Sequence, residues 1–224
     1  MMAVNLGTRG VAEAVALLEY CNGEAGTKWA DLRIANGRVE PYGVTLWCLG
    51  NEMDGPWQIG HKDAHEYGGL AAAAGKAMKL VDPSIELVAC GSSSMQMPTF
   101  GEWERTVLSY TYDIVDHISM HAYYEELEGD RASFLGSGTA MSRFVERVVA
   151  SADAIGAERR SDKRITVSFD EWNVWYLESR FPGEENLPIQ RDAPRIIEDI
   201  YSALDAVVVG DLIVTLLNHA DRIA

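Results

Sequence analysis

The sequence predicts an α/β fold built on a parallel sheet. Short apolar segments of strand length alternate with longer amphipathic segments, which is the pattern of βα units. The strand-like segments are apolar at nearly every position, as expected for strands that are buried on both faces. The chain has 224 residues, of which 47% are hydrophobic, so it can bury a sizeable core. A β/α barrel and a doubly wound sheet both fit these observations.

The expected elements follow in order along the chain. Apolar runs predict strands at residues 2–6, 44–49, 85–90, 115–121 and 164–170. Helical spacing of apolar residues predicts helices at 10–20, 61–80, 100–112, 141–155 and 195–209. A loop rich in Pro and Glu is expected at 182–188, and residues 211–224 fit either a helix or a strand.

The number of strands favours an incomplete barrel. Five strands are expected, whereas a complete barrel has eight in about 250 residues. Because a strand begins almost at residue 1, an incomplete barrel is preferred over three undetected strands. No GxGxxG follows the first strand and no GxxxxGK[ST] occurs in the chain, so dinucleotide-binding and P-loop folds lack their main support.

Composition limits the function classes. The chain has 34 acidic and 19 basic residues and a formal net charge of −15, which disfavours nucleic acid and anionic membranes but not a neutral sugar. The three cysteines, Cys21, Cys48 and Cys90, form no CxxC pair, which argues against disulfides and structural zinc. No apolar run approaches the roughly 20 residues of a membrane span, and no targeting segment is visible. A soluble, cytoplasmic protein is expected.

Polar side chains follow four of the expected strands. Two of them are glutamates, Glu52 and Glu171, which lie far apart in the sequence and meet only if the sheet brings the strand ends together. Taken singly, each could be a strand-end carboxylate in a salt bridge or a helix cap. Two facing carboxylates are what glycoside hydrolysis needs, because one attacks the sugar while the other donates a proton. Each is expected to raise the pKa of the other.

Aromatic residues near both glutamates are consistent with a sugar site. Trp57 follows Glu52, and Trp175 follows Glu171. Flat apolar rings stack on sugar faces, although tryptophan is also highly buried on average. Trp47, inside an expected strand, is predicted to belong to the core.

Two long segments resemble the signature blocks of family 51 glycoside hydrolases. These α-L-arabinofuranosidases belong to clan A, whose members are retaining β/α-barrel glycosidases. The segments are WCLGNEMDGPWQIGH at residues 47–61 and SFDEWNVW at residues 168–175. Residues 82–93 and 117–124 resemble strands that lie between the two blocks, so the similarity covers nearly the whole chain.

The resemblance implies a (β/α)8 TIM-barrel type of fold that is incomplete in this chain. Family members are about twice as long, so residues 1–224 would be a partial catalytic domain with about strands 3 to 7 and without the family's C-terminal β-sandwich. It also implies that Glu52 is the general acid/base and Glu171 the nucleophile. Four further residues match positions that contact the sugar or lie near the nucleophile: Asn51, His121, Tyr123 and Trp175.

The implied activity is release of terminal α-L-arabinofuranosyl residues from arabinan or arabinoxylan oligosaccharides by double displacement. This chemistry needs no metal and no cofactor. Self-association into a homo-oligomer is left open. Two alternatives also remain: an inactive or partner-dependent fragment of such an enzyme, and another clan A retaining glycosidase of the endoglucanase type.

Overall fold

The computed structural model describes residues 1–176 and 201–224. The loop expected at 182–188 and the start of the helix expected at 195–209 lie outside these residues. All five expected strands are present, with shorter or shifted bounds: β1 (Met2–Ala3), β2 (Leu46–Cys48), β3 (Glu86–Ala89), β4 (His117–Tyr124) and β5 (Thr166–Val174).

The strands form one parallel sheet in the order β1-β2-β3-β4-β5. This spatial order is the same as the order in the chain, whereas a doubly wound sheet reverses its strand order at a switch point. After the last helix the chain returns to β5, where Ile223 makes a single parallel bridge with Val167. The sheet is therefore a curled half-barrel, and the doubly wound alternative is wrong.

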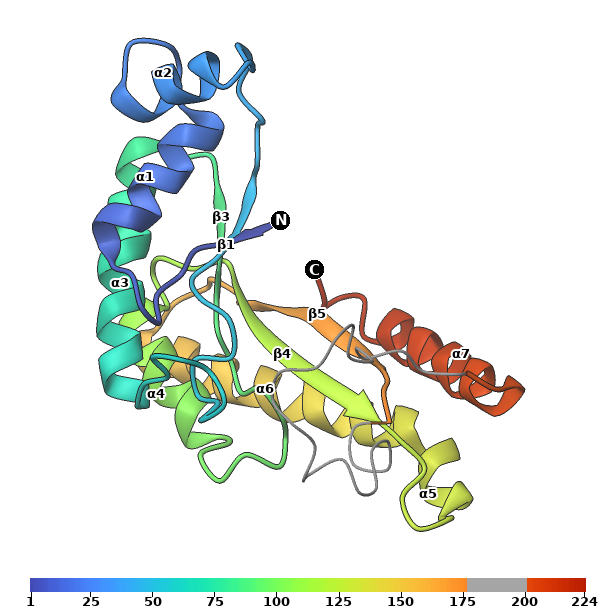
Figure 1. Cartoon of the computed structure of the whole chain (residues 1–224). Coiled ribbons are helices and arrows are strands. Elements are labelled where there is room, and N and C mark those ends of the chain that lie inside the picture. The colour runs from blue at the N-terminus through green and yellow to red at the C-terminus, as the bar shows by residue number, and fades with distance from the viewer. Residues whose placement is uncertain (177–200) are drawn as a thin grey trace.

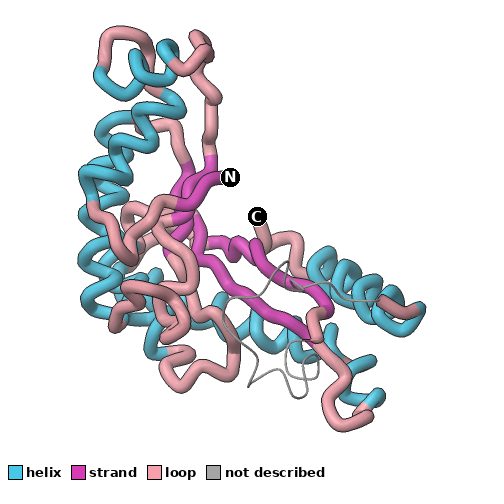
Figure 2. Tube along the Cα trace, viewed as in Figure 1, coloured by secondary structure: helices cyan, strands magenta, loops and turns pink. Residues whose placement is uncertain are grey.

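Helices cover the outer side of the curved sheet (Figures 1 and 2). Successive helices pack side by side along this surface, α1 against α3, α3 against α4, α4 against α6 and α6 against α7. The helices are α1 (Val11–Asn22), α2 (Lys28–Ala35), α3 (Ala64–Val81), α4 (Glu102–Thr111), α5 (Arg131–Leu135), α6 (Ser137–Arg159) and α7 (Ala203–Asn218). None of the described helices is long and apolar enough to cross a membrane.

Two short helices, α2 and α5, were not expected from the apolar pattern. Helix α2 depends on Arg33, whose fully buried guanidinium donates hydrogen bonds to the backbone oxygens of Tyr20, Gly23 and Val39. Arginine is usually exposed, so Arg33 does not count as an apolar position, and the apolar pattern of this segment predicts no helix. Helix α7 starts at Ala203 and extends to Asn218, so most of the ambiguous segment after residue 211 is helical.

The core lies between the sheet and these helices. Trp47 on β2 is fully buried, as predicted, and its Nε1 donates a hydrogen bond to the Val44 oxygen. The fully buried ring of Tyr67 on α3 stacks on Trp103 of α4 with the ring centres 5.5 Å apart. The Tyr67 hydroxyl donates to the Leu49 oxygen and accepts from the Cys90 N–H, at 2.8 and 2.7 Å. This side chain therefore joins the carboxyl ends of β2 and β3.

Replacing Tyr67 by phenylalanine is expected to lower the free energy of unfolding by about 1–3 kcal/mol. The change leaves the Leu49 oxygen and the Cys90 N–H without their buried partner. Urea denaturation measures the loss, and Tyr110→Phe is the matched control. The Tyr110 ring is exposed and its hydroxyl contacts only His65 among the described side chains, so a change below about 0.5 kcal/mol is expected. Equal losses in both variants would contradict this role of Tyr67.

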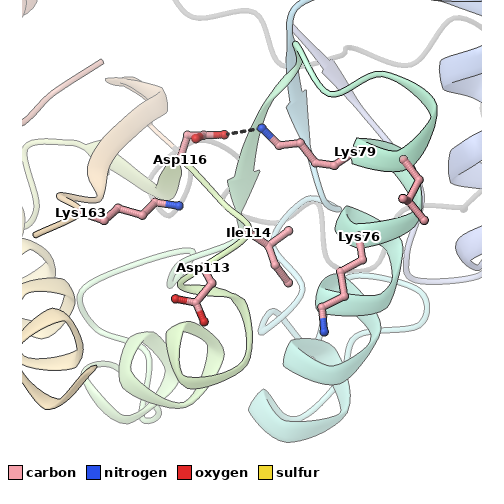
Figure 3. Close-up of a pocket in the computed structure, with 7 residues that line it drawn as sticks. Lys76, Lys79, Asp113, Ile114, Asp116 and Lys163 are labelled. Atoms are coloured by element: carbon pink, nitrogen blue, oxygen red, sulfur yellow. Dashed lines mark hydrogen bonds and ion pairs between the residues drawn. The ribbon is translucent and has the colours of Figure 1, made fainter. Parts of the chain in front are cut away.

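A cavity of about 600 Å³ lies at the amino ends of β4 and β5 (Figure 3). It is lined by the ion pair between Lys79 Nζ and Asp116 Oδ2, 3.3 Å apart, and by Lys163. None of the predicted site residues lines it, because they follow the opposite ends of the strands. Catalytic residues of β/α barrels lie at the carboxyl ends of the strands, so this cavity is not the candidate site.

Candidate active site

The turn after β2 positions Glu52. Gly50 has a φ of +108°, and a Cβ at this position would lie 2.8 Å from Met53 Cγ, so only glycine fits. Glu52 itself has a φ of +44°, in the left-handed region that side-chain-bearing residues seldom adopt. Such backbone conformations cluster at functional sites. The Gly55 N–H closes the turn by donating to the Glu52 oxygen at 2.9 Å.

Three donors surround the Glu52 carboxylate. Oε2 accepts hydrogen bonds from Trp57 Nε1 at 2.6 Å and Gln58 Nε2 at 3.2 Å. Oε1 lies 3.0 Å from Nδ1 of His121, which comes from β4. Glu52 is thus held both by its own loop and by a strand two positions away in the sheet. Trp57 is more than half exposed and is not part of the core.

An irregularity in the pairing of β4 with β5 places Glu171. Ser119 pairs with Ser168, but His121 pairs with Glu171, so between these pairs one residue of β4 lies opposite two of β5. The extra residue is a β-bulge, which changes the face on which the following side chains lie. Simple alternation from Ser168 would place Glu171 on the opposite face. The bulge instead puts Glu171 on the same face as its partner His121.

Tyr123 and His121 contact the Glu171 carboxylate. The Tyr123 hydroxyl donates a hydrogen bond to Oε2 at 3.0 Å, and Nδ1 of His121 lies 3.6 Å from the same oxygen. The Tyr123 ring packs edge-on against Trp175, with the ring centres 4.6 Å apart. His121 therefore lies closer to Glu52 than to Glu171, although the resemblance placed it near the nucleophile.

The two glutamates meet at the carboxyl end of the sheet. One carboxylate oxygen of Glu52, one of Glu171 and a ring nitrogen of His121 all lie within 4.8 Å of one another. A cavity of about 640 Å³, lined in part by Glu52, Trp57, Tyr123 and Trp175, opens beside them. The two carboxylates are close enough for one of them to attack the substrate directly. An inverting pair is farther apart, because a water must fit between it and the substrate.

The same cluster has the spacing that a metal ion would need. However, the spacing alone assigns no metal here, because acidic groups at such distances are common without one. Nδ1 of His121, one of its possible ligand atoms, already faces the carboxylates of Glu52 and Glu171. The chemistry open to a pair of carboxylates, acid/base and nucleophilic catalysis, requires no ion.

The pKa of Glu52 differs from the expectation that the neighbouring glutamate raises it. Burial raises the pKa of Glu52, but hydrogen bonds from His121, Trp57 and Gln58, together with the charge of His121, outweigh it. The pKa of Glu52 therefore lies below its ordinary value. The physical reason is that three donors stabilise the ionised carboxylate.

His121 carries the positive charge of the site. Burial lowers its pKa, but contacts with Asp170 and Glu52 and the charge of Glu171 raise it to about 9. Since the ordinary value is 6.5, folding strengthens proton binding at this imidazole. The resulting stabilisation is fully present below about pH 6.5 and is lost as the pH rises through about 9.

His121→Gln is expected to remove this pH dependence. The wild-type free energy of unfolding should fall between about pH 6.5 and 9, and the variant should show a clearly smaller fall over the same range. Urea denaturation at several pH values measures both slopes. The part of the fall in unfolding free energy that both proteins share comes from the other titrating groups. Parallel curves for the two proteins would show that His121 does not hold the proton.

Five of the six predicted site residues come together in space. Glu52, His121, Glu171, Tyr123 and Trp175 form the contacts described above, and Asn51 lies exposed on the turn directly before Glu52. Sequence reasoning missed two residues at the site, Gln58 and Asp170. Gln58 lies in the quoted block at 47–61, but nothing in its spacing indicates a contact with Glu52. Asp170 comes directly before Glu171, and simple alternation places the two side chains on opposite faces, so nothing in the sequence indicates that both reach His121.

Comparison with known families identifies the chain. A family model described as the alpha-L-arabinofuranosidase 1 domain matches residues 5–136, more than half of the sequence. The chain belongs to the α-L-arabinofuranosidase family. A second model, described as the alpha-L-arabinofuranosidase C-terminal domain, matches residues 170–224. The boundary between the two matches therefore lies before the segment that contains Glu171.

Two α-L-arabinofuranosidase relatives show how much of such a protein is present. The intracellular exo-alpha-(1->5)-L-arabinofuranosidase of Streptomyces lividans is 58% identical over 223 residues, which are 100% of this chain and 34% of the relative. The exo-alpha-(1->6)-L-arabinofuranosidase of Bifidobacterium longum is 54% identical over 100% of this chain and 44% of its own length. The chain thus spans less than half the length of these relatives.

Solved structures of α-L-arabinofuranosidases share the fold. A family 51 alpha-L-arabinofuranosidase from Bifidobacterium longum superimposes with a TM-score of 0.93 at 47% identity, covering 100% of this chain and 45% of that one. The enzyme from Thermotoga maritima, solved as an arabinose complex, gives a TM-score of 0.81 at 32% identity and covers 99% and 41% of the two chains. The curled half-barrel therefore corresponds to part of a family 51 structure.

Proposed function

We propose that this chain carries the catalytic pair of a retaining α-L-arabinofuranosidase. The enzyme would release terminal α-L-arabinofuranosyl residues from arabinan or arabinoxylan oligosaccharides. The strongest support is that Glu52 and Glu171 meet, with carboxylate oxygens within 4.8 Å of each other, in a protein of this family. Relatives named exo-α-L-arabinofuranosidases support removal of terminal units.

In the first step Glu171 attacks the anomeric carbon of the arabinofuranosyl unit. The hydrogen bond from Tyr123 fixes its orientation, and the imidazole of His121 lies 3.6 Å from the same carboxylate oxygen. The bond to the leaving-group oxygen breaks as a glycosyl ester forms on Glu171, and Glu52 gives this oxygen a proton. Bound sugar displaces water from Glu52, and the added burial raises its pKa toward the value an acid needs.

In the second step Glu52 acts as a base. Once Glu171 is an ester its negative charge is gone, so Glu52 loses a neighbour that favoured its protonated form. The donors Trp57, Gln58 and His121 then stabilise the ionised carboxylate. Glu52 takes a proton from water, which attacks the anomeric carbon and releases arabinose with its configuration retained. Neither step uses a metal or a cofactor.

The sugar would lie in the cavity beside the glutamates. Trp57 and Trp175 supply flat apolar surface there. Asn51, exposed on the turn directly before Glu52, has an amide that can hydrogen-bond a sugar hydroxyl. A neutral substrate is consistent with the net charge of −15, which makes nucleic acid and anionic membranes poor partners. We further propose a cytoplasmic location, since the Streptomyces lividans relative is named intracellular. Self-association remains a prediction.

The relation of this chain to a complete enzyme is also part of the proposal. We assign β1–β5 to the third to seventh strands of the barrel and treat residues 1–224 as one partial barrel domain. Support comes from the sequential strand order and from Ile223, which lies beside β5 where an eighth strand would begin. The alternative is that this chain is inactive without the remaining strands.

A chimera tests the function and the alternative together. In it, this chain replaces the matching segment of the Streptomyces lividans relative, which is 58% identical there. Both the chimera and the 224-residue chain are assayed with an aryl α-L-arabinofuranoside and a panel of aryl glucosides and xylosides. We expect the chimera to cleave the arabinofuranoside selectively. Activity of the chain alone would exclude the inactive-fragment alternative, and preference for a glucoside would favour an endoglucanase-type enzyme.

A further inference from the structure

Asp170 is a carboxylate at the site, with its side chain 10% exposed, that the proposed mechanism does not use. It lies in the β-bulge, between Ser168 and Glu171 in the pairing with β4. Its Oδ2 accepts a hydrogen bond from the Ser168 hydroxyl at 3.3 Å and from the Cys48 thiol of β2 at 3.6 Å. Its Oδ1 has no aligned hydrogen-bond donor in the described part of the chain but lies 3.2 Å from Nε2 of His121, an ion-pair contact.

His121 is therefore surrounded by carboxylates on both sides of its ring. Nδ1 lies 3.0 Å from Glu52 and 3.6 Å from Glu171, and Nε2 lies 3.2 Å from Asp170. A neutral imidazole has one N–H and one lone pair, so one of its nitrogens would turn a lone pair toward an anion. An imidazolium has an N–H on each nitrogen. Only the doubly protonated ring gives both sides an attractive contact in this arrangement.

We propose that Asp170 is a positioning residue that keeps both nitrogens of His121 protonated and so holds Nδ1–H on the Glu52 carboxylate. The proposal deepens the proposed function, on which it rests for the role of Glu52. Asp170 does not touch the reacting atoms. It acts through His121, on the side of the ring away from the two glutamates.

The electrostatics of the neighbouring groups support this arrangement. The His121 side chain is only 4% exposed, yet its pKa is raised to about 9, with Asp170 the largest favourable cause. The other charged groups that face it are Glu52 after β2 and Glu171 on β5. Burial, followed by the charge of Asp170, raises the pKa of the Cys48 thiol, so Cys48 remains a neutral donor. Among the described residues, the negative charge of Asp170 is thus balanced by His121 and not by a second cation.

The consequence for catalysis lies in the protonation of Glu52. A cationic His121 stabilises the ionised form that Glu52 needs as a base, and it sets the pH above which Glu52 can no longer act as an acid. Without the Asp170 charge, His121 would lose its second proton at lower pH. Glu52 would then bind its own proton more tightly, and the alkaline limb of the pH–rate profile would move to higher pH.

The test is an NMR titration of His121 in this chain, with its signals assigned by their loss in His121→Gln. In the wild type, ¹⁵N shifts should show both ring nitrogens protonated near neutral pH, with a midpoint near 9. In Asp170→Asn the amide oxygen can still face Nε2–H, but the charge is removed. The midpoint is expected to fall by at least about one pH unit. Ser168→Ala, which removes only a neutral donor to the same carboxylate, should leave it nearly unchanged.

Two results would overturn the proposal. One is a neutral His121 near neutral pH in the wild type, a measurement that needs no variant and stands even if Asp170→Asn does not fold. The other is a folded Asp170→Asn protein whose His121 midpoint is unchanged. In the active chimera, Asp170→Asn should also move the alkaline limb of kcat/KM upward. Because the titration does not depend on turnover, failure of the proposed function is scored separately, by inactivity of the chimera.

Discussion

Glu171→Ala in the chimera is expected to lower turnover of an aryl α-L-arabinofuranoside by at least about 10⁴-fold. The change removes the group that attacks the anomeric carbon, so no glycosyl ester can form. Azide added to the variant should restore part of the activity, since the small anion fits the space left by the carboxylate. Its product should be an arabinosyl azide of inverted configuration, because azide attacks from the face that Glu171 occupied.

Glu158→Ala is the control for this experiment. Glu158 is an exposed glutamate on α6 that, among the described residues, pairs only with Arg105, 2.9 Å away, so its loss should leave turnover unchanged. Thermal unfolding of both variants shows whether the fold is retained. If a folded Glu171→Ala protein kept its turnover, the nucleophile assignment would be wrong. Rescue by azide with retained configuration would assign Glu171 to the acid/base role instead.

Glu52→Ala is expected to lower kcat by about 10²–10⁴-fold, the usual contribution of general acid–base catalysis. The loss should be larger for natural oligosaccharides than for aryl glycosides, because a good leaving group departs without a proton. With the aryl glycoside, breakdown of the ester on Glu171 becomes the slow step. Azide should accelerate it and yield an azide product of retained configuration, the opposite of the Glu171→Ala result.

Gln58→Ala is the matched variant for the acid/base experiment. It removes a donor to Oε2 of Glu52 but keeps the carboxylate, so turnover should persist with the pKa of Glu52 moved upward. The pH–rate profile of kcat measures this shift. Glu52→Ala should instead lose the limb of the profile that reports Glu52. Retention of that limb in Glu52→Ala would show that another group donates the proton.

The parts of the fold that depend on local pattern could be predicted from the sequence. All five strands follow apolar runs, because strands buried on both faces carry few polar residues. The helices that pack on the sheet follow from their apolar spacing. The helices α2 and α5 could not be predicted, since α2 depends on the buried Arg33 and α5 has only five residues. The strand order, which decides between a barrel and a doubly wound sheet, follows only from the structure.

The site was predicted as a set of residues but not as an arrangement. The placement of Glu52 and Glu171 after apolar runs indicated a carboxylate pair, and the family blocks indicated their neighbours. The β-bulge at Asp170 has no sequence signal, because it depends on the pairing of β4 with β5. The same bulge brings a third carboxylate to His121, and the hydrogen bond and charge of His121, with the hydrogen bonds from Trp57 and Gln58, lower the pKa of Glu52.

The central claim is that Glu52 and Glu171 face each other across one cavity and act as a pair. A crystal structure of the chimera, with arabinose bound, measures this directly. We predict carboxylate groups about 5–5.5 Å apart, with the anomeric carbon of the sugar between them. A separation beyond the roughly 9.5 Å that any glycosidase pair spans, or side chains on opposite faces of the sheet, would contradict the account.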